Sequence, residues 1–391
     1  MRLLFVHDIK ALVCGKDVFA RSYGPNIWER YLKVFDSITV CTRCKQVVDK
    51  KQVKGIDKVT GERVHFDGRI GMFLGPDAFF SKKIWSILRE DIQNHDGVII
   101  RLDSFMGLMA VRECRKQNKP YVIECVGCAW DSFWNHGISG KILAPFLFAQ
   151  MRKAIKNAPY VIYVTKEFLQ GRYPTNGRNT NISNVALPAI EDVVLKERLM
   201  RIDTNDSDKK HLMTLANVGI RYKGFQFVIQ ALGIIKKQTG RCDYVYHIVG
   251  EGDQTYLREQ ADKAGVTECV VFHGPVKHEQ VFNLLKNDVD IYIQPSLQEG
   301  LPRAMIEAMS CALPCIGSDV AGIPELIQSD YTYKRSRNMS KQIASILESF
   351  NKKKMKDASK YNFETSKNYA SELLTERRTK FLIEYKKSLM Q

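Results

Sequence analysis

Along the first half of the chain, segments with the apolar pattern of a strand are followed by segments with the apolar pattern of a helix. Short apolar, β-branched runs predict strands at residues 2–8, 37–43, 97–101, 119–125 and 160–165. Between them, apolar residues at helical spacing predict helices over 26–35, 82–94, 107–117 and 142–157. Strands that take turns with helices indicate a parallel sheet with helices on both faces. An extended piece at 181–186 then leads into the polar segment 187–209, which we expect to be a partly mobile hinge.

The second half repeats this pattern and ends two strands in loops rich in glycine and proline. Residues 290–294 form an apolar run that Pro295 stops, and Gly300 permits a sharp turn before a helix that begins near Pro302. A further strand at 314–317 leads into a second loop of this kind. Open α/β sheets bind their ligands in such loops, at the carboxyl ends of strands.

Two carboxylates flank the first of these loop-to-helix junctions. Glu299 falls in the loop, and Glu307 falls on the helix, four residues after Arg303. The free amides at the helix start, 300–303, suit an anion such as a phosphate. An alternative is that Glu299 is an ordinary loop acid and that Glu307 pairs with Arg303, which would contribute only ~0.3–0.5 kcal/mol at the surface. These residues alone leave both interpretations open.

The surrounding sequence resembles the donor-site signature of retaining glycosyltransferases of family 4, the glycosyl transferases group 1. The resemblance rests on PSLQEGLPRAMIEAM and LPCIGSDVAGIPEL in this segment. Upstream it continues through LMTLANVGIRYKGFQFVIQAL, YHIVGEGD and VVFHGPV, so that it covers roughly residues 210 to 330. It implies the α/β fold called GT-B, in which two Rossmann-like domains face each other across a cleft. The first would be an acceptor domain at 1–190, joined by a C-terminal helix at about 372–391 that crosses back, and the second a nucleotide-sugar donor domain at 191–371.

The resemblance also implies roles for individual residues. Lys223 and Arg221 would hold the donor diphosphate, although Arg221 stands closer to the KG pair than is usual in the family. Glu307 would accept hydrogen bonds from the ribose hydroxyls, and Glu299 from hydroxyls of the donor sugar. The remaining donor-binding positions would be Gly219, Gly250, Gly300, Leu301 and Pro302.

The first half departs from the family pattern at two places. The glycine-rich loop that usually follows the first strand is reduced here to Gly15 and Lys16. The usual histidine that faces the donor sugar has one counterpart, His136, well past its strand in ECVGCAWDSFWNHG. His136 is therefore either a catalytic group or an ordinary loop or helix-cap histidine.

The function that follows is transfer of a sugar, with retention of configuration, from a UDP-, GDP- or other nucleotide-sugar to a glycan or a polyprenyl-diphosphate-linked glycan. We expect a hexosyltransferase of cell-surface polysaccharide biosynthesis that needs no cofactor. We expect no metal either, because Lys223, Arg221 and the helix amides take the charge of the leaving group. A catalytically silent GT-B protein that only binds the donor remains an alternative. A dinucleotide-dependent oxidoreductase is disfavoured, because GEGDQT has Thr255 where the third glycine of that fingerprint belongs.

Composition adds a possible surface partner. The net charge is +16, divided into +11 over residues 1–200, +4 over 201–250, −8 over 251–330 and +9 over 331–391. A basic lobe is attracted to anionic lipid by ~1 kcal/mol per basic residue, whereas the plain alternative is a solubilising surface. No run approaches the ~18–20 apolar residues of a spanning helix, and no nucleic-acid motif is present. We therefore expect a cytoplasmic protein, peripheral on the inner face of the cytoplasmic membrane, with no nucleic-acid partner.

Overall fold

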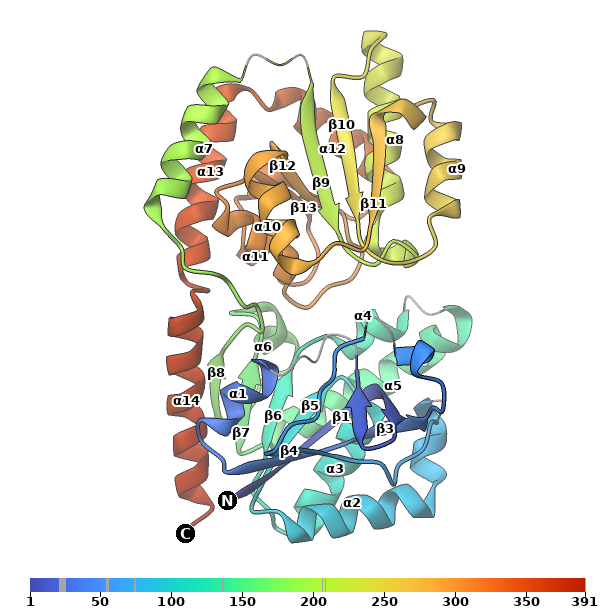
Figure 1. Cartoon of the computed structure of the whole chain (residues 1–391), viewed down its shortest axis with the longest axis vertical. Coiled ribbons are helices and arrows are strands. Elements are labelled where there is room, and N and C mark those ends of the chain that lie inside the picture. The colour runs from blue at the N-terminus through green and yellow to red at the C-terminus, as the bar shows by residue number, and fades with distance from the viewer. Residues whose placement is uncertain are drawn as a thin grey trace. The chain divides into compact units, whose positions relative to one another are not determined.

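The structure is a computed structural model that describes residues 1–391 except 21–25, 54, 55, 74, 135, 136, 206, 208 and 391. Its internal contacts divide the chain into two units. Unit 1 comprises Met1–Ile182 and Leu374–Gln391, and unit 2 comprises Ser183–Leu373. Each unit has its own sheet with helices packed around it (Figure 1).

The sheet of unit 1 runs in the order β4-β3-β1-β5-β6-β7-β8, and these neighbours pair in parallel. Its central strands β5, β6 and β7 are buried along their whole length and are mostly apolar. Their charged residues, Arg101 and Glu124, pair with each other at 2.6 Å. The strands are β1 (Arg2–Cys14), β3 (Ser37–Gln46), β4 (Val64–Asp67), β5 (Gly97–Leu102), β6 (Val122–Cys125), β7 (Tyr160–Tyr163) and β8 (Arg178–Asn181). The helices are α1 (Asn26–Leu32), α2 (Lys82–Asn94), α3 (Phe105–Lys116), α4 (Ala129–Trp134), α5 (Gly137–Lys156) and α6 (Phe168–Arg172).

The first strand is longer than the sequence predicts. β1 continues past residue 8 to Cys14, turns at Gly15 and Lys16, and pairs antiparallel with β2 (Asp17–Phe19). Its register against β3 shifts between Val6 and Lys10, so the polar residues 7 and 8 form an irregularity within the strand rather than its end. A hairpin turn therefore occupies the place where the family pattern has a glycine-rich loop.

The last helix, α14 (Ser371–Ser388), packs on the sheet of unit 1. The hydroxyl of Tyr385 accepts a hydrogen bond from the amide of Val98 at 2.7 Å and donates to the carbonyl oxygen of Pro120 at 3.0 Å. Lys386 donates to the carbonyl oxygen of Val34 at 2.7 Å. These bonds tie the end of the chain to β5 and to the loops beside it.

The sheet of unit 2 runs in the order β11-β10-β9-β12-β13-β14, with every neighbouring pair parallel. Its strands are β9 (Lys210–Leu215), β10 (Tyr244–Val249), β11 (Val270–Gly274), β12 (Ile291–Gln294), β13 (Cys315–Ser318) and β14 (Thr332–Tyr333). The helices are α7 (Asp192–Thr204), α8 (Phe225–Thr239), α9 (Thr255–Lys263), α10 (His278–Asn287), α11 (Arg303–Ser310), α12 (Met339–Ser349) and α13 (Lys352–Lys367). In the described part of the chain, no helix has both the length and the apolar character needed to cross a bilayer.

The expectation of a partly mobile hinge over 187–209 is wrong for most of that segment. Residues 192–204 form α7, which docks on unit 2 through two buried side chains, Arg198 and Ile202. Arg198 donates to the carbonyl oxygens of Leu285 and Val289 at 2.7 Å each. Its guanidinium thus satisfies carbonyls at the end of α10, an interaction that the polar composition of the segment conceals.

Three histidines form a ladder across neighbouring strands of unit 2. Nε2 of His247 lies 2.8 Å from Nδ1 of His211, and Nδ1 of His247 lies 2.8 Å from Nε2 of His273. Both bonds form when each neutral ring carries its proton on Nε2. Burial and the two flanking rings lower the pKa of His247 to about 4. The ladder therefore favours a neutral central imidazole.

This ladder predicts an acid-sensitive unit 2. Because the folded pKa of His247 is about 4 against an ordinary value of 6.5, its contribution to stability is present above pH 6.5 and is lost as pH falls through that interval. We expect a His247→Gln variant to unfold at a lower temperature near pH 7 but to lose less further stability on acidification than the wild type. Thermal unfolding followed at several pH values measures this. His65→Gln, at an exposed position of β4, is the matched control, and equal acid sensitivity of His247→Gln and wild type would contradict the interpretation.

Candidate functional site

The carboxyl edge of the unit 2 sheet gathers most of the residues singled out by the sequence. Because the strands are parallel, the loops that follow β9, β10, β12 and β13 all open at this edge. The amide of Gly322 donates to the carbonyl oxygen of Gly300 at 2.9 Å, which joins the loops after β12 and β13. The site thus lies within one unit and is built from loops that bond to one another.

The centre of this edge is an ion pair between Lys223 and Glu299. Nζ of Lys223 lies 2.7 Å from Oε1 of Glu299, and the two side chains are only 20% and 12% exposed. Nε2 of Gln294, the last residue of β12, donates to the same oxygen at 3.0 Å. The sequence predicts both charged residues as donor-binding groups, and the structure brings them into direct contact.

Backbone geometry forces this contact. The amide of Leu297 donates to the carbonyl oxygen of Tyr222 at 2.7 Å, which joins the loop after β12 to the one after β9. Gly224 has a left-handed φ of 81°, and any Cβ there would collide with the carbonyl oxygen of Pro295. The two loops approach closely enough for the ion pair only because residue 224 is glycine.

The second carboxylate has a different partner from the one suggested by helical spacing. Glu307 is a buried residue of α11, and its Oε1 lies 3.4 Å from Nε2 of His278, the first residue of α10. The hydrogen bond to Glu307 raises the pKa of His278. Burial raises the pKa of Tyr292, and the charges of Glu307 and Glu299 raise it further.

Arg221 and the predicted glycines border the same edge. The guanidinium of Arg221, an exposed residue, lies 4.4 Å from the ring centroid of Tyr256. This stacking holds the cation beside the start of α9. Gly250 has a φ of 144°, and a Cβ there would collide with the carbonyl oxygen of Ala216, while Gly219 lies against the backbone of Gly252 and Asp253. The loops after β9 and β10 therefore pack backbone to backbone.

The start of α11 supplies amide donors to this edge. Gly300, Leu301 and Pro302 lead into the helix, with Pro302 at its N-cap rather than in its first turn. The first amides of a helix lack intrahelical acceptors and carry the positive end of its dipole. They complete a set in which cations and amide donors stand beside two carboxylates, an arrangement suited to a ligand with both an anionic and a polyhydroxyl part.

The first unit contributes less of the predicted site. His136 lies outside the described residues. In unit 1, Asp8, at the irregularity within β1, accepts a hydrogen bond from the amide of Phe105 at 3.0 Å, and Asp103, directly after β5, accepts one from Ser132. Burial raises the pKa of both carboxyl groups. Sequence reasoning missed this pair, whose one signal is that each aspartate stands at or just after the end of a sequence segment predicted as a strand.

Gln294, His278 and Tyr256 also escaped the sequence analysis. Each directly contacts one of the predicted residues, Glu299, Glu307 and Arg221 respectively. Gln294 ends a predicted strand, and His278 lies shortly after the end of β11. A search of strand ends for polar side chains would have found these two, whereas Tyr256 carries no comparable signal.

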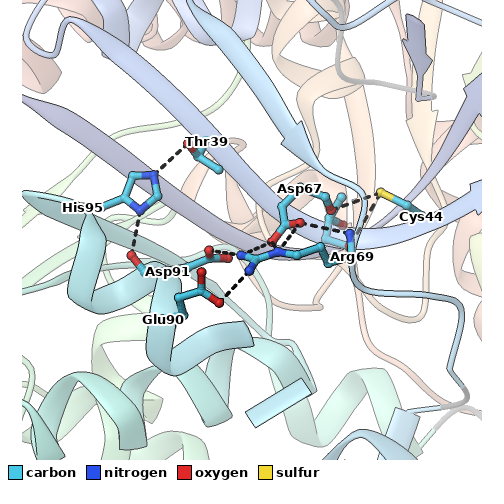
Figure 2. Close-up of polar contacts among 8 residues, drawn as sticks. Thr39, Cys44, Asp67, Arg69, Glu90, Asp91 and His95 are labelled. Carbon is cyan, nitrogen blue, oxygen red and sulfur yellow. Dashed lines mark hydrogen bonds and ion pairs between the residues drawn. The ribbon is translucent and has the colours of Figure 1, made fainter. Parts of the chain in front are cut away.

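A second polar cluster lies within unit 1 (Figure 2). Among the described residues, Cys41, Asp67 and Asp91 are the group whose ligand atoms lie close enough together to surround a metal ion. Figure 2 shows Arg69 reaching Asp67, Asp91 and Glu90, with its Nε 3.0 Å from Oδ1 of Asp67. A guanidinium thus already provides the positive charge for these carboxylates, and the cluster is an ion-pair network.

Comparisons with known proteins agree with this architecture. Residues 196–365 match the family model described as glycosyl transferases group 1. The chain is 33% identical to protein CapJ of Staphylococcus aureus over 337 residues, which cover 85% of this chain and 83% of CapJ. It is also 35% identical to the amylovoran biosynthesis glycosyltransferase AmsK of Erwinia amylovora, over 27% of each chain.

Solved structures show the same fold at low identity. Anabaena HepE in complex with UDP-glucose superposes with a TM-score of 0.65 at 14% identity, over 98% of this chain and 100% of HepE. WaaG, a glycosyltransferase involved in lipopolysaccharide biosynthesis, superposes with a TM-score of 0.61 at 14% identity, over 96% of this chain and 98% of WaaG. The predicted fold class is confirmed. The chain therefore belongs to the group 1 glycosyltransferases, and its two parallel α/β units are those of the GT-B fold.

Proposed function

We propose that the chain transfers a sugar, with retention of configuration and without a metal ion, from a nucleotide-sugar to a glycan or lipid-linked glycan. The observation that carries the proposal is the contact between Lys223 and Glu299 beside the start of α11. It places a cation, a hydroxyl acceptor and amide donors within one small volume. A nucleotide-sugar offers the matching diphosphate and hydroxyl groups.

Each end of the donor has its own partners in this proposal. The ribose hydroxyls bind Glu307, and the sugar hydroxyls bind Glu299. Hydrogen bonds to a charged carboxylate contribute ~1.5–3 kcal/mol each. The ammonium group of Lys223 donates a hydrogen bond to Glu299. When the donor sugar binds that carboxylate, the diphosphate of the donor therefore comes within reach of Lys223. Arg221 and the amides of α11 complete the anion site.

Catalysis then consists of positioning and of neutralising the diphosphate as it departs. The acceptor hydroxyl attacks the anomeric carbon, the bond to the diphosphate breaks, and the proton of the hydroxyl passes to the leaving phosphate on the same face. Unit 2 is the donor domain in this scheme, and unit 1 with α14 is the acceptor domain. Asp8 and Asp103 are the acceptor-side groups that unit 1 offers.

The biological setting is proposed from the relatives. AmsK is by name an amylovoran biosynthesis glycosyltransferase, and WaaG is involved in lipopolysaccharide biosynthesis. We therefore place this chain in cell-surface polysaccharide assembly, in the cytoplasm at the inner face of the membrane, acting on a polyprenyl-diphosphate-linked acceptor. HepE binds UDP-glucose, which makes UDP-sugars the first donors to test.

The experiment that tests the proposal is a panel of UDP- and GDP-sugars incubated with the protein. Slow release of free nucleotide, accelerated by an acceptor glycan, supports a transferase. Binding without any release, even with acceptors, would indicate a catalytically silent donor-binding protein. The anomeric configuration of the product, read by NMR, tests retention, and an inverted linkage would contradict the mechanism.

The role of Glu307 gives a direct prediction. Replacing it by Gln keeps the shape of the side chain but removes the charge that accepts the ribose hydroxyls, so we expect donor binding to weaken by ~1–3 kcal/mol. Calorimetric titration with the preferred nucleotide-sugar measures this, and Arg303→Gln, an exposed position on the same helix, is the control. Unchanged affinity together with a lowered melting temperature would mean that Glu307 has only a structural role.

The cationic groups of the site predict that a chelator does not change the rate of sugar transfer. If Lys223, Arg221 and the helix amides neutralise the departing diphosphate, EDTA leaves the rate of transfer unchanged. Lys223→Met, in contrast, lowers that rate by about two to three orders of magnitude, the usual loss when one group that stabilises developing charge is removed. Initial rates with and without EDTA check both statements. Loss of transfer on chelation, restored by Mg²⁺ or Mn²⁺, would refute the metal-independent mechanism.

A further inference from the structure

An apolar groove runs along the surface of unit 1 between α3 and α5. Its volume is about 570 Å³, and η2 (Gly75–Phe80) closes one side of it. The apolar lining consists of residues spaced along one face of each helix, together with two from η2: Phe79, Phe80, Phe105, Leu108, Val111, Leu143, Phe146, Leu147 and Ala154. This volume is within the range of sites that hold small ligands, about 300–1,000 Å³.

The groove leaves large apolar side chains in contact with solvent. Phe80 is 86% exposed and Phe146 is 57% exposed. One turn before Phe146 on the same helix, Ile142 is 73% exposed, and it extends the apolar surface toward the start of α5. A contiguous apolar surface of this kind on a protein marks a binding site rather than a chance exposure.

Apart from Gln150, the polar lining of the groove is cationic. Arg112, Arg115 and Lys153 line it near the ends of α3 and α5, and no carboxylate is among the described residues that do so. The guanidinium of Arg115 donates to the carbonyl oxygen of Ala154 at 2.9 Å, which fixes it across the two helices. Arg112 and Lys153 are exposed. The groove therefore joins an apolar wall to a positive end.

The apolar wall continues toward the edge of the sheet where an acceptor would bind. A smaller pocket shares Phe105, Leu108 and Leu147 with the groove and ends at Asp103, directly after β5. The apolar lining of the groove is thus shared in part with a pocket that reaches the carboxyl end of β5.

We propose that this groove docks unit 1 on a bilayer of anionic lipid by taking up a hydrocarbon chain of a membrane lipid. The chain covers Phe80, Phe146 and their neighbours, and the lipid phosphates pair with Arg112 and Lys153. Burial of the chain removes apolar surface from water, and the cations add attraction to the anionic surface. Only the biological role of this docking rests on the proposed function: it would hold unit 1, the proposed acceptor domain, at the membrane that carries lipid-linked glycans.

Flotation with liposomes tests the proposal. Wild-type protein is mixed with vesicles of phosphatidylcholine alone or with added phosphatidylglycerol, at low and high salt. We expect binding to the anionic vesicles that salt weakens without abolishing, because the apolar part is not screened. The double variant Phe80→Ser, Phe146→Ser should bind about tenfold less well or worse at both salt concentrations.

Matched variants distinguish binding through this groove from non-specific adsorption of exposed apolar residues and from purely electrostatic binding. Val193→Ser with Met200→Ser removes two exposed apolar side chains of α7, 47% and 63% exposed, and should bind as the wild type does. Arg112→Gln with Lys153→Gln should weaken binding at low salt to the level that the wild type shows at high salt, and should leave binding at high salt unchanged. Wild-type binding by the Phe80, Phe146 variant, or no binding of the native protein to anionic vesicles, would overturn the proposal.

Donor binding in the same preparations keeps the two proposals apart. If the protein binds vesicles through this groove but binds no nucleotide-sugar, the proposed function fails and the membrane surface stands. If it binds the donor but no anionic vesicle, the surface fails and the transferase stands. Circular dichroism of each variant confirms that the exposed substitutions leave the fold intact.

Discussion

The ion pair between Lys223 and Glu299 is the interaction on which the geometry of the proposed donor site depends. It joins the loop after β9 to the loop after β12, and Gln294 supports the same carboxylate from the end of its strand. A partly buried carboxylate without partners would be costly. The ion pair therefore holds a hydrogen-bond acceptor and a cation together at the carboxyl edge of the unit 2 sheet. Gly224 makes this possible, because only glycine lets the backbone pass the carbonyl oxygen of Pro295.

The loops at the carboxyl edge could be predicted from the sequence because their chemistry is local. Pro295, Gly300 and the alternating strand before them fix where the chain turns, so Glu299 and Glu307 could be placed at an edge without knowledge of the fold. The partners of these carboxylates could not be predicted, because His278 and Lys223 reach them across the sheet from distant segments. The resemblance supplied Lys223, whereas spacing along the helix pointed to Arg303 for Glu307 and was misleading.

In two other segments, the local sequence pattern predicted the wrong structure because contacts with distant residues determine it. His7 and Asp8 interrupt an apolar run and so predict the end of a strand, yet β1 continues to Cys14 because β2 and β3 pair with it on both sides. The segment around Arg198 is polar enough to suggest a hinge, yet its arginine is buried against the carbonyl oxygens of α10. In both segments, hydrogen bonds to distant residues outweigh the local preference.

Hydrogen–deuterium exchange with and without the preferred nucleotide-sugar tests the central claim most directly, because it locates the donor on the chain. The account predicts slower exchange on donor binding at residues 219–224 and 299–307, where the cations, the carboxylates and the helix amides lie, and no change around the Asp67 and Asp91 cluster of unit 1. Protection confined to other segments, with exchange at 219–224 and 299–307 unaffected, would contradict it.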